Sequence, residues 1–135
     1  MGNGEINTIP FRSGVVTIIG ATNSGKSTLV NALVDKPVSI VSDKPQTTRL
    51  RTVGILNLPN AQILLQDTPG ISHPRILFEE KLVRLALESL KGSDAIIFLL
   101  DATQGFREWE DIILQHLKKI SVPTILAINL SLIHI

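Results

Sequence analysis

A short loop near the start of the sequence has the residue types and the spacing needed to hold a chain of phosphates. Gly20 is followed five residues later by Gly25, Lys26 and Ser27, which gives the pattern G-x-x-x-x-G-K-S. Successive backbone N–H groups in such a loop can surround an anion, and glycine permits the close approach that this needs. Lys26 can reach the β- and γ-phosphates, and the Ser27 hydroxyl can ligate Mg²⁺. The pattern predicts that a nucleoside triphosphate binds to Gly20, Ala21, Thr22, Asn23, Ser24, Gly25, Lys26, Ser27 and Thr28.

A carboxylate downstream is placed to hold the same metal ion. The stretch ILLQDTPG (63–70) is an apolar strand that ends in Asp67, so this side chain would lie at the carboxyl edge of a sheet. We expect Asp67 to hold Mg²⁺, directly or through a water, and the Gly70 N–H to contact the γ-phosphate. Alone, D-T-P-G is a common strand-end turn, but its place after the phosphate loop favours a nucleotide site that includes Asp67, Thr68, Pro69 and Gly70.

The polar loop Lys44–Arg49 lies between these two motifs. A threonine in it could complete the Mg²⁺ shell only while the γ-phosphate is present. A solvated loop with no such role explains the spacing equally well, so the residues alone leave both interpretations open.

The elements that must position these residues follow from the spacing of apolar side chains. Apolar runs predict strands at Val15–Ile19, Arg51–Leu56, Ala61–Gln66, Ala95–Leu100 and Thr124–Asn129. Helical spacing predicts helices between Gly25 and Pro37, over 76–91 and over 108–120, and residues 39–51 are expected to form a long surface loop. This order predicts an α/β fold with a mainly parallel sheet, in which the hairpin supplies one antiparallel edge strand.

Composition limits the function further. Apolar residues make up 44% of the 135 residues, the net charge is +1, and there is no cysteine. These values indicate one globular domain and exclude disulfides, thiolate metal sites and cysteine nucleophiles. The longest apolar run, Ala95–Leu100, is far shorter than a membrane span, and residues 1–14 form a flexible lead-in without the pattern of a secretory signal. We therefore expect a soluble, cytoplasmic protein.

Taken together, the motifs resemble those of the translation-factor-related GTPases, and within them the Era family. The resemblance rests on GATNSGKSTLVNALVDKPVSIVSDKPQTTRLRTVGI (20–55) and LLQDTPGISHP (64–74). Gln46–Arg49 and the proline at 69 favour Era over its tandem-domain and tRNA-modifying relatives. The family implies a P-loop NTPase fold of the Ras-like G-domain type, with Thr48 preferred to Thr47 as the metal ligand.

The resemblance also implies an activity, the hydrolysis of GTP to GDP and phosphate by in-line attack of water. Lys26 and Mg²⁺ would neutralise the developing charge, with Thr48 and Gly70 completing the catalytic set. Ile71 stands where Ras-like enzymes place a catalytic glutamine, and Asn23 matches the asparagine with which relatives hold a potassium ion. We expect slow hydrolysis that K⁺ stimulates.

Partners are implied by the family alone. Era-like proteins carry a C-terminal KH domain that binds small-subunit ribosomal RNA during ribosome assembly, and the family also suggests a peripheral association with the membrane. The sequence after residue 92 has neither a KH-type Gly-x-x-Gly loop nor a basic stripe. RNA binding is therefore not expected from these residues themselves.

The end of the sequence departs from the family. Asn129 should open the guanine-selecting pattern N-K-x-D, but Leu130, Ser131 and Leu132 follow it. The missing aspartate would accept hydrogen bonds from guanine worth about 1.5–3 kcal/mol each, so base selection should be weak. We expect a C-terminally incomplete Era-type G domain over 15–129 and a non-family tail over 130–135. The alternatives are the G domain of another ribosome-assembly GTPase and an inactive fragment that binds nucleotide without selecting the base.

Overall fold

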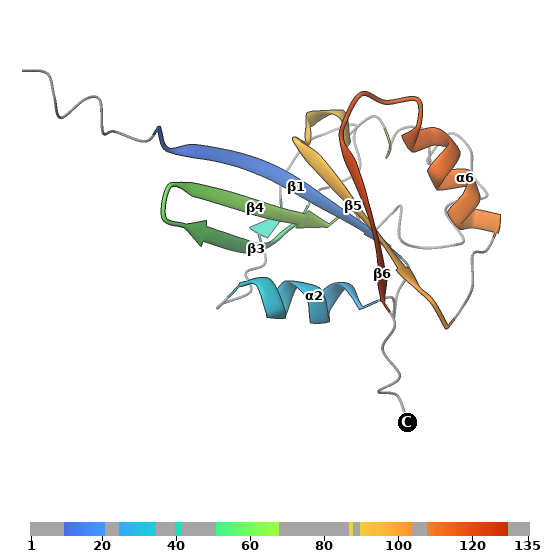
Figure 1. The fold of residues 1–135 in the computed structure, drawn as a ribbon, viewed down its shortest axis with the longest axis horizontal. Coiled ribbons are helices and arrows are strands. Elements are labelled where there is room, and N and C mark those ends of the chain that lie inside the picture. Colours follow the sequence, from blue (N-terminus) through green and yellow to red (C-terminus); the bar gives the residue numbers. More distant parts are fainter. Residues whose placement is uncertain are drawn as a thin grey trace, which may run out of the picture.

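The computed structural model describes residues 10–20, 25–34, 40–41, 51–67, 87, 90–103 and 108–129. Within them, six strands form one sheet in the order β2-β3-β4-β1-β5-β6 (Figure 1). The strands are β1 (Arg12–Gly20), β2 (Ile40–Val41), β3 (Arg51–Leu58), β4 (Ala61–Asp67), β5 (Ala95–Asp101) and β6 (Thr124–Asn129). The helices are α2 (Lys26–Leu33), α6 (Glu108–Leu117) and the short 3-10 helix η1 (Leu90–Gly92).

The sheet is parallel around its centre and antiparallel at one side. β1 pairs in parallel with both β4 and β5, and β5 pairs in parallel with β6. β3 runs antiparallel to β4, and Leu58 pairs with Ala61 across a two-residue turn. The predicted α/β fold with a mainly parallel sheet and an antiparallel hairpin is confirmed.

Several element boundaries differ from those expected. β2 pairs with Arg51 and Thr52 and forms the outer strand beyond β3, although residues 39–51 were expected to be a loop. A two-residue strand is too short to show alternation, so the sequence pattern could not reveal it. β1 begins at Arg12, ahead of the expected start at Val15, because its exposed first residues pair with the start of β4 and carry no apolar signal.

The helices are shorter than their apolar patterns suggested. α2 ends at Leu33, and Val34 is already extended. α6 ends at Leu117, followed by tighter turns in which Lys119 N–H and Ile120 N–H donate to carbonyls three residues back. Most of the predicted helix over 76–91 lies outside the described residues, and its last part contains η1.

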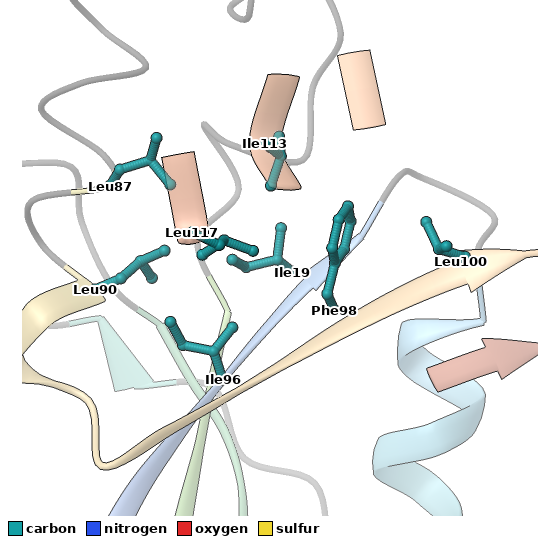
Figure 2. Close-up of a cluster of buried hydrophobic side chains, with 8 residues drawn as sticks. All are labelled: Ile19, Leu87, Leu90, Ile96, Phe98, Leu100, Ile113 and Leu117. Atoms are coloured by element: carbon teal, nitrogen blue, oxygen red, sulfur yellow. The ribbon is translucent and has the colours of Figure 1, made fainter. Parts of the chain in front are cut away.

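The core lies on both faces of the sheet, because neighbouring residues of a strand point to opposite sides. Ile18 joins a cluster with Val30 and Val34 from the α2 segment and Leu65 from β4. Ile19 joins the cluster on the other face, where α6 packs, with Leu87, Leu90, Ile96, Phe98, Leu100, Ile113 and Leu117 (Figure 2). Helical segments thus cover opposite faces of the sheet.

β6 carries several exposed apolar residues. Its side chains Ile125, Leu126 and Ile128 are each more than half exposed, at 58%, 51% and 57%. In the described part of the chain, no helix is long and apolar enough to cross a membrane.

Candidate nucleotide-binding site

The candidate residues meet at one edge of the sheet because the strands that carry them are parallel and in register. Asp67, the last residue of β4, pairs with Ile18 of β1, just before β1 ends at the buried Gly20. At the same edge, Asp101 closes β5 and pairs with Asn129, which closes β6. Ligands of open α/β sheets bind in the crevice outside these carboxyl ends.

Helix α2 starts at this edge from Gly25, whose backbone conformation favours glycine over every other residue. Gly25 is the N-cap residue with φ 103° and ψ 17°, in the left-handed region, and its carbonyl accepts from Leu29 N–H at 2.9 Å. The N–H groups of a first helical turn have no acceptor within the helix, and Gly25 has no side chain to supply one. An anion is the natural partner for such a terminus.

Lys26 and Asp67 lie in direct contact at this edge of the sheet. The Lys26 ammonium donates to Asp67 Oδ1 at 2.7 Å, and the two side chains are 19% and 20% exposed. The contact links the first residue of α2 to the last residue of β4. The sequence placed both residues at one site, and the structure brings them together.

The donor set fits a Mg²⁺ ion. Mg²⁺ prefers hard oxygen ligands and is held in phosphate sites by one or two protein oxygens together with substrate phosphates. Asp67 supplies a carboxylate beside Lys26, and Ser27, the next residue of the helix, is exposed and carries a hydroxyl. These are the residues that would hold the ion.

Asn129 at the end of β6 lies against Gly25. A Cβ atom built on Gly25 would overlap the Asn129 Nδ2 atom. The end of β6 is thereby fixed against the start of α2.

Comparison with known proteins agrees with this geometry. The family model described as 50S ribosome-binding GTPase matches residues 15–130, which include every strand described above from β2 to β6 and most of β1. The chain belongs to this GTPase family.

Similar proteins of the GTPase family are named GTPase Era. The chain is 44% identical over 120 residues to that of Caldicellulosiruptor saccharolyticus and 47% identical over 119 residues to that of Heliobacterium modesticaldum. Each alignment covers 88% of this chain and 40% of the relative, so the chain spans well under half the length of the relatives that it matches.

A solved structure of Era in complex with MgGDPNP and nucleotides 1506–1542 of 16S ribosomal RNA is similar in fold. It superposes with a TM-score of 0.65 at 43% identity, covering 89% of this chain and 41% of that one. The expectation of an Era-like G domain with the P-loop GTPase fold is confirmed.

Part of the site predicted from the GTPase motifs lies outside the described residues. This holds for the loop residues Ala21, Thr22, Asn23 and Ser24, for Thr48, and for Thr68, Pro69 and Gly70. The other predicted site residues are described and lie at strand ends or at the start of α2. Gly20, Asp67 and Asn129 end β1, β4 and β6, and α2 begins with Gly25 as its N-cap, followed by Lys26, Ser27 and Thr28.

Two contacts that support the GTPase site were not predicted. The buried hydroxyls of Thr17 in β1 and Ser93 before β5 lie 2.5 Å apart and form a hydrogen bond. Asp94 Oδ2 accepts from Val15 N–H at 2.7 Å, and Asp94 N–H donates to the Val15 carbonyl at 2.8 Å. Both contacts fix β1, which leads into the phosphate loop, against the start of β5. The polar residues Ser93 and Asp94 directly before the apolar strand β5 are the only sequence signal that could have indicated these two contacts.

Proposed function

We propose that this chain binds GTP with Mg²⁺ and hydrolyses it to GDP and phosphate. The observation that carries the proposal is the meeting of Lys26 and Asp67 at the carboxyl edge of the sheet, where α2 begins at Gly25. A cation for phosphates and a carboxylate for a metal ion are the groups that phosphoryl transfer requires at one place.

The described residues have separate roles in this proposal. Lys26 binds the β- and γ-phosphates, and the first turn of α2 contributes its N–H groups. Ser27 and Asp67 would hold Mg²⁺, which would supply positive charge to neutralise the charge that develops on the phosphates. Asn129 keeps the start of α2 in place through its contact with Gly25.

The resemblance to Era supports the remaining assignments. Thr48 is proposed as a further metal ligand, and the Gly70 N–H as a contact of the γ-phosphate. Asn23 is proposed to hold a potassium ion, and Ile71 offers no side chain that could orient the attacking water. Hydrolysis should therefore be slow and faster in K⁺ than in Na⁺.

Weak base selection is a second proposal, supported by the residues after Asn129. Leu130 and Leu132 occupy the positions of the lysine and the aspartate in the guanine-selecting pattern N-K-x-D. Leucine cannot accept the hydrogen bonds of the guanine ring, so GTP and ATP should bind with similar affinities.

A role in ribosome assembly rests on the relatives. The Era of the solved complex is bound to a 16S ribosomal RNA fragment. We propose the same partner class, the small-subunit RNA, for the protein to which this G domain corresponds. Cytoplasmic location and a peripheral association with the membrane stay predictions from the family.

Release of inorganic phosphate from GTP tests the activity. The wild-type chain should release phosphate in Mg²⁺ and K⁺, and Lys26→Met should reduce the rate to that of the buffer. Lys119→Met, which changes an exposed residue of the turn after α6, is the matched control and should leave the rate unchanged. A wild-type rate equal to that of Lys26→Met would refute the proposed hydrolysis, and equal rates in K⁺ and Na⁺ would refute the proposed potassium site.

A further inference from the structure

The turn that follows β5 ties the end of that strand to the end of β6. Asp101 and Asn129 are the paired last residues of these two parallel strands (Figure 1). Asp101 Oδ1 accepts from the Thr103 N–H at 2.9 Å and from the Thr103 hydroxyl at 2.6 Å, so the chain turns directly after the strand. Within this turn, the Ala102 N–H donates to the Asn129 carbonyl at 3.0 Å. The Asp101 carboxylate therefore orients the N–H group that holds the backbone of Asn129.

We propose that Asp101 is a positioning residue for the nucleotide site and that it acts through Asn129. This role rests on the proposed function, in which the Asn129 side chain keeps the start of α2 in place against Gly25. Among the described strands, β6 pairs with β5 alone, so its contacts with β5 and the turn after it decide where Asn129 lies. The turn at Asp101 is thus connected to the first residues of α2 by two successive contacts, one of backbone and one of side chain.

The bond from Ala102 to Asn129 needs such support because it lies at the very end of the strand pair. Hydrogen bonds at the ends of strands open more easily than those within a sheet. An aspartate that bonds the backbone two residues further on fixes a local turn and limits this opening. Without the Asp101 carboxylate, the Ala102 N–H should leave the Asn129 carbonyl more often, and the Asn129 side chain should lie against Gly25 for less of the time.

Amide hydrogen exchange of the full chain, followed by NMR, tests the first contact. In Asp101→Ala the Ala102 N–H should exchange about tenfold faster than in the wild type, after correction for the intrinsic rate of each sequence. The Ile96 N–H is the internal control, because it donates to the Pro123 carbonyl at 2.9 Å near the opposite end of the same two strands. A general loss of stability would accelerate both amides equally. An equal acceleration, or no acceleration at Ala102, would overturn the proposed role.

Calorimetric titration with GDPNP in Mg²⁺ tests the consequence for the nucleotide site. Asp101→Ala should bind about three- to tenfold more weakly than the wild type, which is the size expected from losing an exposed hydrogen-bonded turn. Asp101→Asn keeps an oxygen that can accept from Thr103, so its affinity should stay within about twofold of the wild type. A loss in Asp101→Asn as large as that in Asp101→Ala would contradict a role that depends on this turn.

Thr103→Val and Thr124→Val form a matched pair that leaves the Asp101 charge in place. Both threonines are exposed, and the Thr124 hydroxyl also makes a local bond, to the Val122 carbonyl at 3.2 Å, at the opposite end of β6. Thr103→Val removes one of the two bonds to Asp101 and should weaken the binding of Mg·GDPNP about two- to fivefold. Thr124→Val should leave the affinity unchanged, and equal losses in the two variants would overturn the proposed role.

A double-mutant cycle shows whether Asp101 acts through Asn129. In the background of Asn129→Ala, the change Asp101→Ala should weaken the binding of Mg·GDPNP less than about twofold further, because the side chain that it positions is already absent. If the wild type binds Mg·GDPNP but the two losses multiply in full, or Asp101→Ala loses no affinity, the role of Asp101 is wrong and the nucleotide site stands. If the wild type binds no Mg·GDPNP, both are wrong.

Discussion

Gly25 and Asn129 fit against each other at the start of α2. Gly25 has a φ of 103°, and the space where a Cβ would stand is filled by the Asn129 side-chain amide. The N-cap residue of α2 is thus also the residue against which the end of β6 packs. The contact brings together the start of α2 and a strand at residues 124–129, which are far apart in the sequence.

Gly25→Ala should therefore be doubly unfavourable. A left-handed conformation costs an L-residue about 1–2 kcal/mol, and the new methyl group must displace Asn129 as well. We expect a loss of at least this size in the free energy of unfolding, measured in urea. Gly92→Ala is the control, because a Cβ on Gly92 meets no atom within 4 Å, and its effect should stay within about 0.5 kcal/mol. Equal losses in the two variants would contradict the assigned contact.

Lys26→Met should weaken the binding of Mg·GDPNP. A charge-assisted hydrogen bond contributes about 1.5–3 kcal/mol, which corresponds to a loss of affinity of roughly 10- to 150-fold. Calorimetry of the wild type, this variant and Lys119→Met measures the effect. An affinity of Lys26→Met within a factor of two of the wild type would remove Lys26 from the phosphate site.

Gly54→Val should destabilise the packing of α2 on the sheet. A Cβ on Gly54 of β3 would already lie 3.1 Å from both γ-carbons of Val34 and 3.2 Å from Val30 Cγ1, so a larger side chain must push the helix away. Overpacking of this kind costs about 1–3 kcal/mol. Because α2 begins at the phosphate loop, nucleotide affinity should fall together with the thermal midpoint. An unchanged midpoint would show that this packing is not tight.

The Thr17–Ser93 hydrogen bond should show strong coupling. Thr17→Val or Ser93→Ala alone leaves a buried hydroxyl without its partner, at a cost of about 1–3 kcal/mol. The double variant should cost less than the two single changes added together, because no buried hydroxyl of this pair then remains. Urea unfolding of the wild type, the two single variants and the double variant measures the coupling. Additive losses in the free energy of unfolding would show that the two hydroxyls form their hydrogen bonds with other groups.

The part of the site that follows from strand ends could be predicted from the sequence. Asp67 ends one apolar strand and Lys26 follows the end of another after a short loop, and parallel neighbouring strands bring such ends to one edge of a sheet. The meeting of the two residues also requires β1 and β4 to be neighbours, which the apolar patterns alone do not determine. The direct ion pair could not be foreseen, because motif roles assign the two residues to different ligands.

Contacts between different helices and strands could not be predicted from the sequence pattern. Thr17 lies within an apolar strand and Ser93 after a short 3-10 helix, and nothing in their spacing couples them across 76 residues. The short strand β2 and the early start of β1 depend on pairing partners rather than on local hydrophobicity. Asp101 at the end of β5 caps the turn that follows it, because its carboxylate accepts from the N–H and the hydroxyl of Thr103.

Competition for one binding site tests most directly the central claim, that this chain holds a nucleoside triphosphate by its phosphates. Fluorescently labelled GTP should bind saturably in Mg²⁺ and should be displaced by unlabelled GTP, and by ATP at a similar concentration, because the contacts proposed for Lys26, Asp67 and the start of α2 are with phosphates and metal. GMP, which has the base but not the phosphate chain, should displace it only at concentrations at least about a hundredfold higher, by the loss of charge-assisted bonds. Absence of saturable binding, or displacement by GMP as effective as that by GTP, would contradict the phosphate site.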